Sequence, residues 1–290
     1  MFNIKNICII GAGNIGIASA VEISQHEQFY VTLLTSHAKK LNGLFKNIDT
    51  ISNKETTGKN IVVTDNYQDA LKNCDLVIVT VPSFLIKNVV EQVSNFSIKM
   101  ILFLPGYGGK EFYCKNLIEK GCLISGVDRT PYVARLSDPT TVHSSPKKHI
   151  RLAVLKNKAS VQLCNLIENL FGIPCSPIQN YLNITFTPSN PILHTSRLFS
   201  MFRNATISTH FSRMIKFYAE WNDDSSSVLF KMDEELMQIC KAFTKINLSD
   251  VIPNSVHYES NTPVLLTKKM KSITSLQNID SPMKLVIIST

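Results

Sequence analysis

Residues 11–16 have the sequence Gly11-Ala12-Gly13-Asn14-Ile15-Gly16. They follow the apolar run 6–10 and precede apolar residues at helical spacing, which predicts a strand, a turn and a helix. The three glycines serve three purposes in such a turn: a tight bend, room for backbone to approach a pyrophosphate, and close packing of helix on strand. The helix N-terminus also offers free backbone N–H groups to phosphates. We therefore expect all six residues to bind a dinucleotide.

Apolar runs alternate with helical patterns after this turn. Strands are expected at 30–34, 61–63, 75–82, 100–104, 123–127 and 149–155. Helices are expected between them, at 66–71, 84–93 and 160–170, and the segment that ends at Lys59 is read as a polar stretch. Continuous apolar strands are typical of a parallel sheet that is buried on both faces. The first half of the chain is thus expected to be an α/β domain of the Rossmann type, with a doubly wound parallel sheet.

The pattern changes beyond about Thr187. Apolar residues now recur at intervals of three and four, as in 193–202 and 228–240, which predicts helices. We therefore expect a dinucleotide-binding domain over 1–187 and an all-helical substrate domain over 188–290. The apolar run 285–288 is a candidate edge strand.

Composition narrows the function classes. The chain has 290 residues, 44% hydrophobic and 18% charged, and no apolar run has the about 18–20 residues of a membrane helix. Without a signal-peptide pattern at its start, it is expected to be soluble and cytoplasmic, with no membrane partner. Its seven cysteines and seven histidines are scattered, so neither disulfides nor a metal site is expected. The net charge of +8 comes from dispersed lysines, which favours anionic small ligands over nucleic acid; a homodimer is left open.

The segments that follow two of the strands bear on the type of dinucleotide. An NAD site usually places Asp or Glu against the ribose 2′-hydroxyl, but residues 35–40 contain neither. Ser36 and Lys39 would suit a 2′-phosphate, so NADP is favoured and NAD is the alternative; a solvated pair of lysines would explain the same residues. Val81 and Pro82 end a strand and are expected to line the same crevice.

Four segments, in chain order, resemble the octopine/nopaline (opine) dehydrogenase family: 11–16, 104–112, 131–135 and 190–194. The last, Asn190-Pro191-Ile192-Leu193-His194, is the most specific. The resemblance implies reductive condensation of an amino acid with a 2-oxo acid such as pyruvate, using hydride from a nicotinamide cofactor. It also implies that His194 donates and accepts the proton, which suits an imidazole with a pKa of ~6.5.

The substrate carboxylates need cationic partners. Arg135 and Arg197 are candidates because their forked donors match a carboxylate. Arg197 lies three residues after His194, so both share one face of a helix. The family also has an Arg-Tyr-x-x-Glu-Asp segment whose aspartate orients the histidine, and this segment does not occur in the 290 residues. Asp233 is a candidate substitute, although a solvated position on a helix face or a structural contact explains the residue more readily.

Two other functions are weighed against an opine dehydrogenase. Hydroxy-acid dehydrogenases of the 3-hydroxyacid or ketopantoate type share the N-terminal layout and resemble one another in a helical Lys-x-x-x-Asn. After residue 187, no lysine of this chain has an asparagine four positions later, which lowers that alternative. The other alternative is a shortened relative that binds the dinucleotide without turnover.

Overall fold

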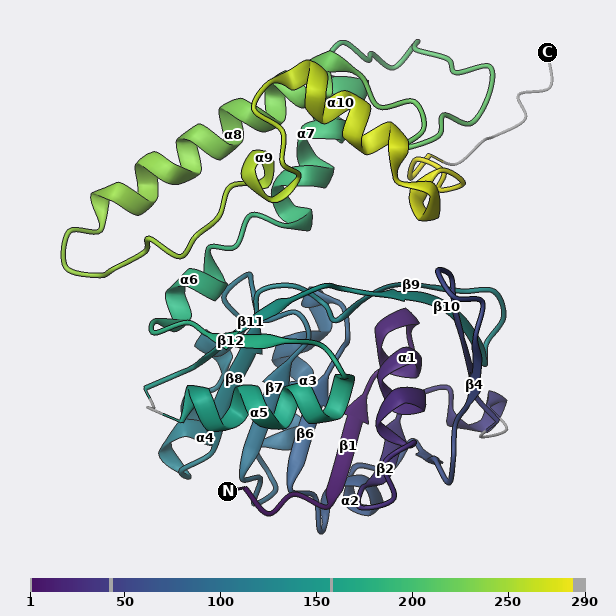
Figure 1. Ribbon diagram of the computed structural model, residues 1–290, viewed down its shortest axis with the longest axis vertical. Coiled ribbons are helices and arrows are strands. Elements are labelled where there is room, and N and C mark those ends of the chain that lie inside the picture. The colour runs from purple at the N-terminus through teal and green to yellow at the C-terminus, as the bar shows by residue number, and fades with distance from the viewer. Residues whose placement is uncertain (1, 42–43, 157–158, 284–290) are drawn as a thin grey trace. The chain divides into compact units, whose positions relative to one another are not determined.

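The structure is a computed structural model that describes residues 2–41, 44–156 and 159–283 (Figure 1). The chain divides into two compact units, Met1–Phe186 and Thr187–Thr290. The apolar run 285–288, a candidate edge strand, lies outside the described residues. Within the described ranges, no helix has the length and apolar character needed to cross a membrane.

The first unit is built on an eight-stranded sheet with the order β12-β11-β8-β7-β6-β1-β2-β5. Neighbours from β5 to β8 run parallel, whereas β11 is antiparallel to β8. The strands are β1 (Asn6–Ile10), β2 (Tyr30–Leu34), β5 (Val62–Thr64), β6 (Leu76–Val79), β7 (Met100–Phe103), β8 (Leu123–Val127), β11 (Ile150–Val154) and β12 (Cys175–Pro177). The order reverses between β1 and β6, so their carboxyl ends form the switch point at which such sheets bind ligands.

Helices cover both faces of this sheet, as expected for a doubly wound fold (Figure 1). Side chains alternate along a strand, so Ile7 and Ile9 of β1 enter one core with Ile17, while Cys8 and Ile10 enter the other. The helices of this unit are α1 (Asn14–Ile23), α2 (Tyr67–Leu71), α3 (Ile86–Val93), α4 (Lys115–Glu119), α5 (Ser160–Phe171) and α6 (Tyr181–Thr185), with the 3-10 turns η1 (Ala38–Lys40), η2 (Ser83–Leu85) and η3 (Lys110–Tyr113).

A second sheet of four strands, in the order β4-β3-β10-β9, lies outside the sequence prediction. Its strands are β3 (Lys46–Asp49), β4 (Glu55–Thr57), β9 (Tyr132–Leu136) and β10 (Thr141–Pro146). The polar stretch before Lys59 therefore contains two strands. They lack a continuous apolar run because each buries only part of its side chains: Asn47 is buried, whereas Lys46 and Glu55 are exposed. Paired with β10, this polar segment folds against α1.

The second unit is helical over its described residues, as predicted. It contains α7 (Asn190–Phe202), α8 (Asp223–Ala242), α9 (Asn254–His257), α10 (Pro263–Ser272) and η4 (Thr274–Leu276). Its core forms around Trp221, Leu229 and Leu266, all with 0% exposure. The two longer helices after α7 begin at side-chain caps, since Asn222 accepts from Ser225 N and Thr262 accepts from Leu265 N.

Candidate functional site

Steric limits explain the glycines of the turn that joins β1 to α1. Gly11 has φ +111°, a region that L side chains rarely adopt. A Cβ on Gly16 would lie 1.8 Å from Gly11 O, so only glycine allows α1 to pack this closely on the turn. At Gly13 a Cβ would meet no atom within 4 Å. The turn is thus closed toward the protein at its two ends and open at its centre, where a phosphate would approach.

The backbone amides of this turn are available to an anion. The first helical hydrogen bond of α1 runs from Ile17 N to Gly13 O at 3.0 Å, and Gly11 N donates to Leu34 O at 2.9 Å. Over the described residues, the amides from Ala12 to Gly16 have no protein acceptor. Consecutive free amides at a helix N-terminus are the usual cradle for a phosphate. The residues present therefore fit a dinucleotide pyrophosphate.

The side chain of Asn14 serves the fold. Its Oδ1 accepts a hydrogen bond of 2.8 Å from Leu136 N, which ties β9 to the start of α1. Any contribution of Asn14 to a cofactor would therefore come from its backbone N–H. The same bond places Arg135, one residue earlier and exposed, beside the glycine turn. We propose that Arg135 contacts an anionic group near this turn.

Residues after β6 complete the switch point. Ile10 of β1 pairs with Val79 of β6, so the two strands end side by side. Thr80 Oγ1 then donates to Ile10 O and Gly11 O at 3.1 Å each, which fixes the turn. Val81 is half-buried and Pro82 is exposed at this edge. The structure thus brings both predicted residues to the glycine turn.

The segment after β2 has no acidic side chain to meet a ribose hydroxyl. Thr35 is buried and its amide donates to Thr64 O at 2.9 Å, whereas Ser36, Lys39 and Lys40 are exposed in or beside η1. Because β2 pairs with β1 in parallel, this cationic segment leaves the sheet at the same edge as the glycine turn. The arrangement supports the prediction of a 2′-phosphate, which stays a prediction.

Sequence reasoning missed two buried charges after β7. Lys110 is 4% exposed and donates through Nζ to Pro105 O at 2.7 Å; burial lowers its pKa to about 8. Glu111 is equally buried and accepts from Thr185 Oγ1, and burial raises its pKa. The sequence feature that could have indicated these buried charges is a Lys-Glu pair directly after the glycine-rich segment 106–109.

His194 lies on α7 and is half-buried. Its Nε2 is 2.9 Å from the hydroxyl of Tyr218, and its ring meets that of Phe217 edge-on with centroids 5.6 Å apart. Tyr218 is 5% exposed and stacks on Trp221 with an interplanar angle of 12°. The hydroxyl is therefore held in place by packed aromatic rings. No motif surrounds Tyr218 in the sequence, only an aromatic-rich segment, 217–221.

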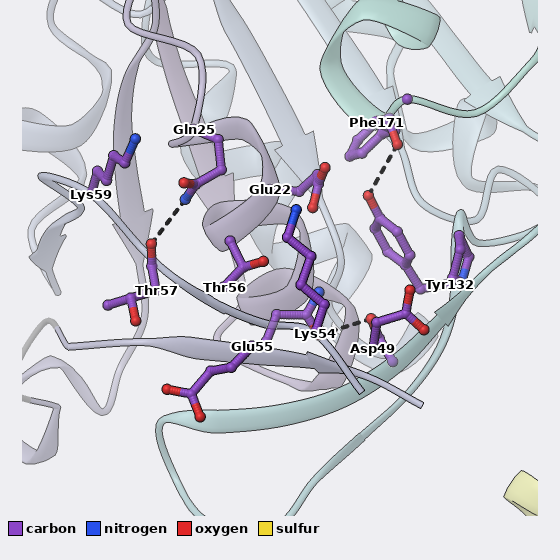
Figure 2. A pocket seen from close by; sticks show the side chains of 14 residues that line it. Glu22, Gln25, Asp49, Lys54, Glu55, Thr56, Thr57, Lys59, Tyr132 and Phe171 are labelled. Atoms are coloured by element: carbon purple, nitrogen blue, oxygen red, sulfur yellow. Dashed lines mark hydrogen bonds between the residues drawn. The ribbon is translucent and has the colours of Figure 1, made fainter. Parts of the chain in front are cut away.

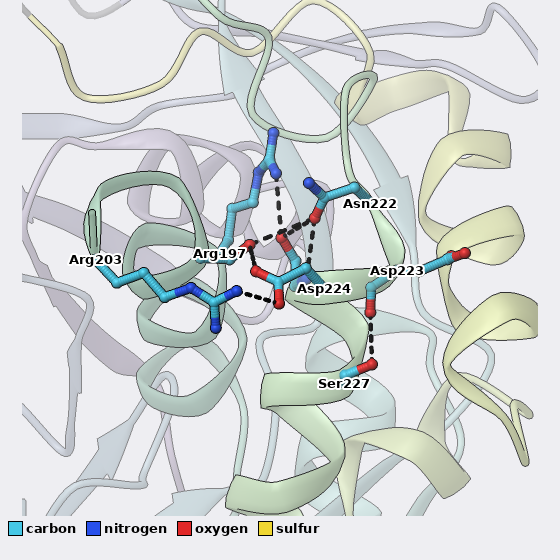
Figure 3. Close-up of polar contacts among 8 residues, drawn as sticks. Arg197, Arg203, Asn222, Asp223, Asp224 and Ser227 are labelled. Carbon is cyan, nitrogen blue, oxygen red and sulfur yellow. Dashed lines mark hydrogen bonds and ion pairs between the residues drawn. The ribbon is translucent and has the colours of Figure 1, made fainter. Parts of the chain in front are cut away.

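Arg197 has contacts that differ from its prediction. It is 3% exposed, and its guanidinium donates to Phe217 O at 3.1 Å and Glu220 O at 2.8 Å. A third bond, to Ser225 Oγ at 3.1 Å, joins α7 to the start of α8 (Figure 3). In the same region Arg203 pairs with Asp224 at 2.7 Å. We therefore propose a structural role for Arg197 in place of substrate binding.

Asp233, a candidate partner for the histidine, also makes structural contacts. It is 3% exposed and accepts from Ser255 N at 2.8 Å and Asn254 Nδ2 at 3.5 Å. These donors belong to the first turn of α9, where a carboxylate is favoured. These contacts agree with the structural alternative for Asp233. The side chain that contacts His194 Nε2 is Tyr218.

Comparison with known proteins identifies the family. Residues 177–286 match the model of the NAD/NADP octopine/nopaline dehydrogenase alpha-helical domain. This match supports the octopine/nopaline dehydrogenase family for the helical unit. Residues 6–104 match the N-terminal domain of NAD-dependent glycerol-3-phosphate dehydrogenase, so the glycine turn lies in an NAD(P)-binding domain.

Solved structures share this architecture. Octopine dehydrogenase with NADH and L-arginine has a TM-score of 0.79 and 18% identity, over 97% of this chain and 77% of that one. Yersinopine dehydrogenase with NADP+ has a TM-score of 0.70 and 15% identity, over 97% and 79%. A probable 2-dehydropantoate 2-reductase from Bacillus subtilis has a TM-score of 0.51 and 17% identity, over 95% and 94%. These likenesses confirm the predicted fold.

A curated relative adds little to the assignment. The protein y4xO of Sinorhizobium fredii (strain NBRC 101917 / NGR234), described as uncharacterized, is 22% identical over 212 residues. These residues are 67% of this chain and 56% of that protein, so the match spans just over half of the relative. The predicted resemblance to the octopine/nopaline dehydrogenases and the NAD(P) cofactor class are confirmed.

Proposed function

We propose that the protein is an opine dehydrogenase that condenses an amino acid with a 2-oxo acid such as pyruvate and reduces the resulting imine. The main support is His194, which lies in an Asn-Pro-x-x-His segment near the start of the helical unit that matches the family. Its Nε2 is 2.9 Å from the Tyr218 hydroxyl. The glycine turn supports the proposal because its free amides fit a dinucleotide. A bound nicotinamide dinucleotide supplies the hydride for such a reduction.

His194 is the proposed proton donor and acceptor. A histidine titrates near neutral pH, so it can give a proton to the reacting nitrogen or oxygen and take one back. The Tyr218 hydroxyl fixes the orientation of the ring through Nε2. An orienting hydrogen bond keeps a catalytic imidazole in one tautomer, a role that an aspartate has in Ser-His-Asp enzymes. We propose that role for Tyr218 here.

Coenzyme choice and substrate contacts follow from exposed cations. We propose NADP as the preferred coenzyme because Ser36, Lys39 and Lys40 follow β2 where an NAD site has a carboxylate. Arg135 is the proposed partner of a substrate carboxylate, since it is exposed one residue before Leu136, whose amide bonds Asn14 of the glycine turn. A cytoplasmic location is proposed as well, supported by seven free cysteine thiols.

The test follows the oxidation of NADPH and of NADH with pyruvate and a panel of single amino acids. Consumption of NADPH that requires both the 2-oxo acid and an amino acid is expected, with the opine detected by mass spectrometry. His194→Ala should slow it by roughly 10²–10⁴-fold while coenzyme binding persists. Binding without consumption for every amino acid would favour the alternative of a dinucleotide-binding protein without turnover. Consumption with a 2-oxo acid alone would favour a hydroxy-acid dehydrogenase.

A further inference from the structure

The first unit contains a polar cavity of about 690 Å³ that is separate from the glycine turn. Glu22 and Gln25 of α1, the second sheet and the end of α5 line it (Figure 2). The glycine turn lies at the other end of α1, roughly 12 Å away along the helix axis for eight residues of rise. None of the proposed cofactor residues lines the cavity. A ligand bound there would leave the dinucleotide site free.

Much of the cavity wall is held by internal contacts. Gln25 Nε2 donates to Thr57 O at 2.9 Å, and Tyr132 Oη donates to Phe171 O at 3.4 Å (Figure 2). Glu55 is committed to an ion pair of 2.7 Å with Lys46. Below them Ser144 Oγ donates to Asn47 Oδ1 at 2.8 Å, and both residues are buried. The wall is therefore built before any ligand arrives.

Glu22, Asp49, Lys54, Glu55 and Lys59 are the charged residues that line the cavity. Asp49 accepts from the amides of Ile51 and Ser52, and Glu55 is paired with Lys46, which leaves Glu22 as the carboxylate to consider. Glu22 is half-buried, and among the described residues its carboxylate has no hydrogen bond or ion pair. Burial raises its pKa, while the nearby His26 and Lys54 act the other way. Lys54 is exposed in the turn between β3 and β4 and reaches toward Glu22 (Figure 2), but the two do not form an ion pair within 4.0 Å. A half-buried carboxylate without a partner is costly unless something supplies its hydrogen bonds.

We propose that this cavity binds a free amino acid as a zwitterion, with its ammonium group at Glu22 and its carboxylate at Lys54. A molecule that carries both charges a few bonds apart completes both unpaired groups, whereas a simple cation or anion completes one and is repelled by the other. The volume suits a small molecule, since ligand pockets of about 300–1,000 Å³ are typical. The site is additional to the reaction proposed above and does not depend on it.

The test is isothermal titration of the full chain, without coenzyme, with L-glutamine as probe. Saturable binding is expected, and N-acetyl-L-glutamine and L-glutaminamide, which lack one charge each, should bind at least about tenfold more weakly. Glu22→Gln and Lys54→Met should each weaken L-glutamine by a similar factor. Glu55→Gln is the matched control, because that carboxylate lines the same cavity but is paired with Lys46.

Three results with the wild type, the probes and Glu22→Gln would overturn the proposal, and a fourth comes from His194→Ala. The first is the absence of saturable heat when folded protein is titrated with L-glutamine up to tens of millimolar. The second is an unchanged affinity of Glu22→Gln for L-glutamine, and the third is an equal affinity of the wild type for L-glutamine and N-acetyl-L-glutamine. His194→Ala separates this site from the reaction, since the proposal requires that it bind L-glutamine as the wild type does. Loss of binding in His194→Ala alone would move the amino acid to the helical unit and count against the cavity. Circular dichroism and thermal unfolding of each variant confirm that it is folded.

Discussion

His194 Nε2 lies 2.9 Å from the hydroxyl of Tyr218, a residue 24 positions further along the chain. The histidine that a motif singles out is thus oriented by a residue that no motif marks. Because Tyr218 is buried between His194 and Trp221, its hydroxyl has little freedom to leave. The pair is the feature of the helical unit that most directly bears on proton transfer.

Tyr218→Phe should lower kcat by roughly tenfold and His194→Ala by roughly 10²–10⁴-fold. Removing the hydroxyl frees the ring to adopt unproductive orientations but leaves the aromatic packing. KM should change little, and the pH profile of kcat should shift because the hydrogen bond to imidazole is gone. Tyr113→Phe, at a tyrosine that is 51% exposed, is the control. An unchanged kcat in Tyr218→Phe would remove the orienting role.

Two glycine substitutions should have opposite effects on stability and binding. Gly16→Ala should destabilise the first unit strongly, because its Cβ would lie 1.8 Å from Gly11 O. Gly13→Ala should leave thermal unfolding nearly unchanged, since no atom lies within 4 Å of its Cβ, but should weaken NADPH binding where the phosphate needs that space. Titration of NADPH fluorescence and a melting curve measure both. Full NADPH affinity in Gly13→Ala would contradict the proposed phosphate position.

Arg197→Met should destabilise the protein by about 3 kcal/mol, because three hydrogen bonds are lost and two carbonyls, that of Phe217 buried and that of Glu220 partly buried, are left without that donor. Arg135→Met should leave stability unchanged, since that side chain is exposed, and should instead raise the KM for the 2-oxo acid. Denaturant unfolding and steady-state kinetics distinguish the two arginines. A stable Arg197→Met with an elevated KM would restore the substrate role predicted from sequence.

Lys110 should make stability depend on pH in the alkaline range. Burial lowers its pKa from 10.5 to about 8, so between these values the unfolded state binds a proton that the folded state has lost. The free energy of unfolding attributable to Lys110 therefore rises as pH increases from 8 toward 10.5, by about 2–3 kcal/mol. Comparing wild type with Lys110→Met at pH 7 and pH 10 isolates this effect. A constant difference between the two proteins would mean that the lysine stays protonated.

Lys39→Ala combined with Lys40→Ala should reduce the preference for NADPH over NADH by about tenfold or more, since charge-assisted hydrogen bonds to a 2′-phosphate are lost. NADH affinity should change little, because its ribose carries no phosphate. Lys87→Ala, an exposed lysine on α3, is the control. A double variant that keeps the wild-type ratio of dissociation constants would leave the coenzyme preference to other residues.

Local patterns were enough for the parallel sheet and the helical unit. The glycine turn, the buried strands around it and the spacing of apolar residues on α7 and α8 reflect interactions within a few residues, so they can be read along the chain. The same holds for Val81 and Pro82, because parallel strands bring their carboxyl ends to one edge. His194, by contrast, was marked by the resemblance of 190–194 to the opine dehydrogenases, and its catalytic role stays a proposal.

Contacts between distant residues decided the rest. Ser144 bonds Asn47 across 97 positions in a sheet whose strands look polar, and Tyr218 meets His194 only because the segment after α7 packs back on it. Arg197 was predicted from sequence to bind a carboxylate, yet its burial against backbone carbonyls supports the structural role proposed for it. The physical reason is that the burial and the hydrogen-bond partners of a side chain depend on tertiary packing. The residue type alone does not tell whether a charged or polar side chain faces solvent, a ligand or a backbone carbonyl.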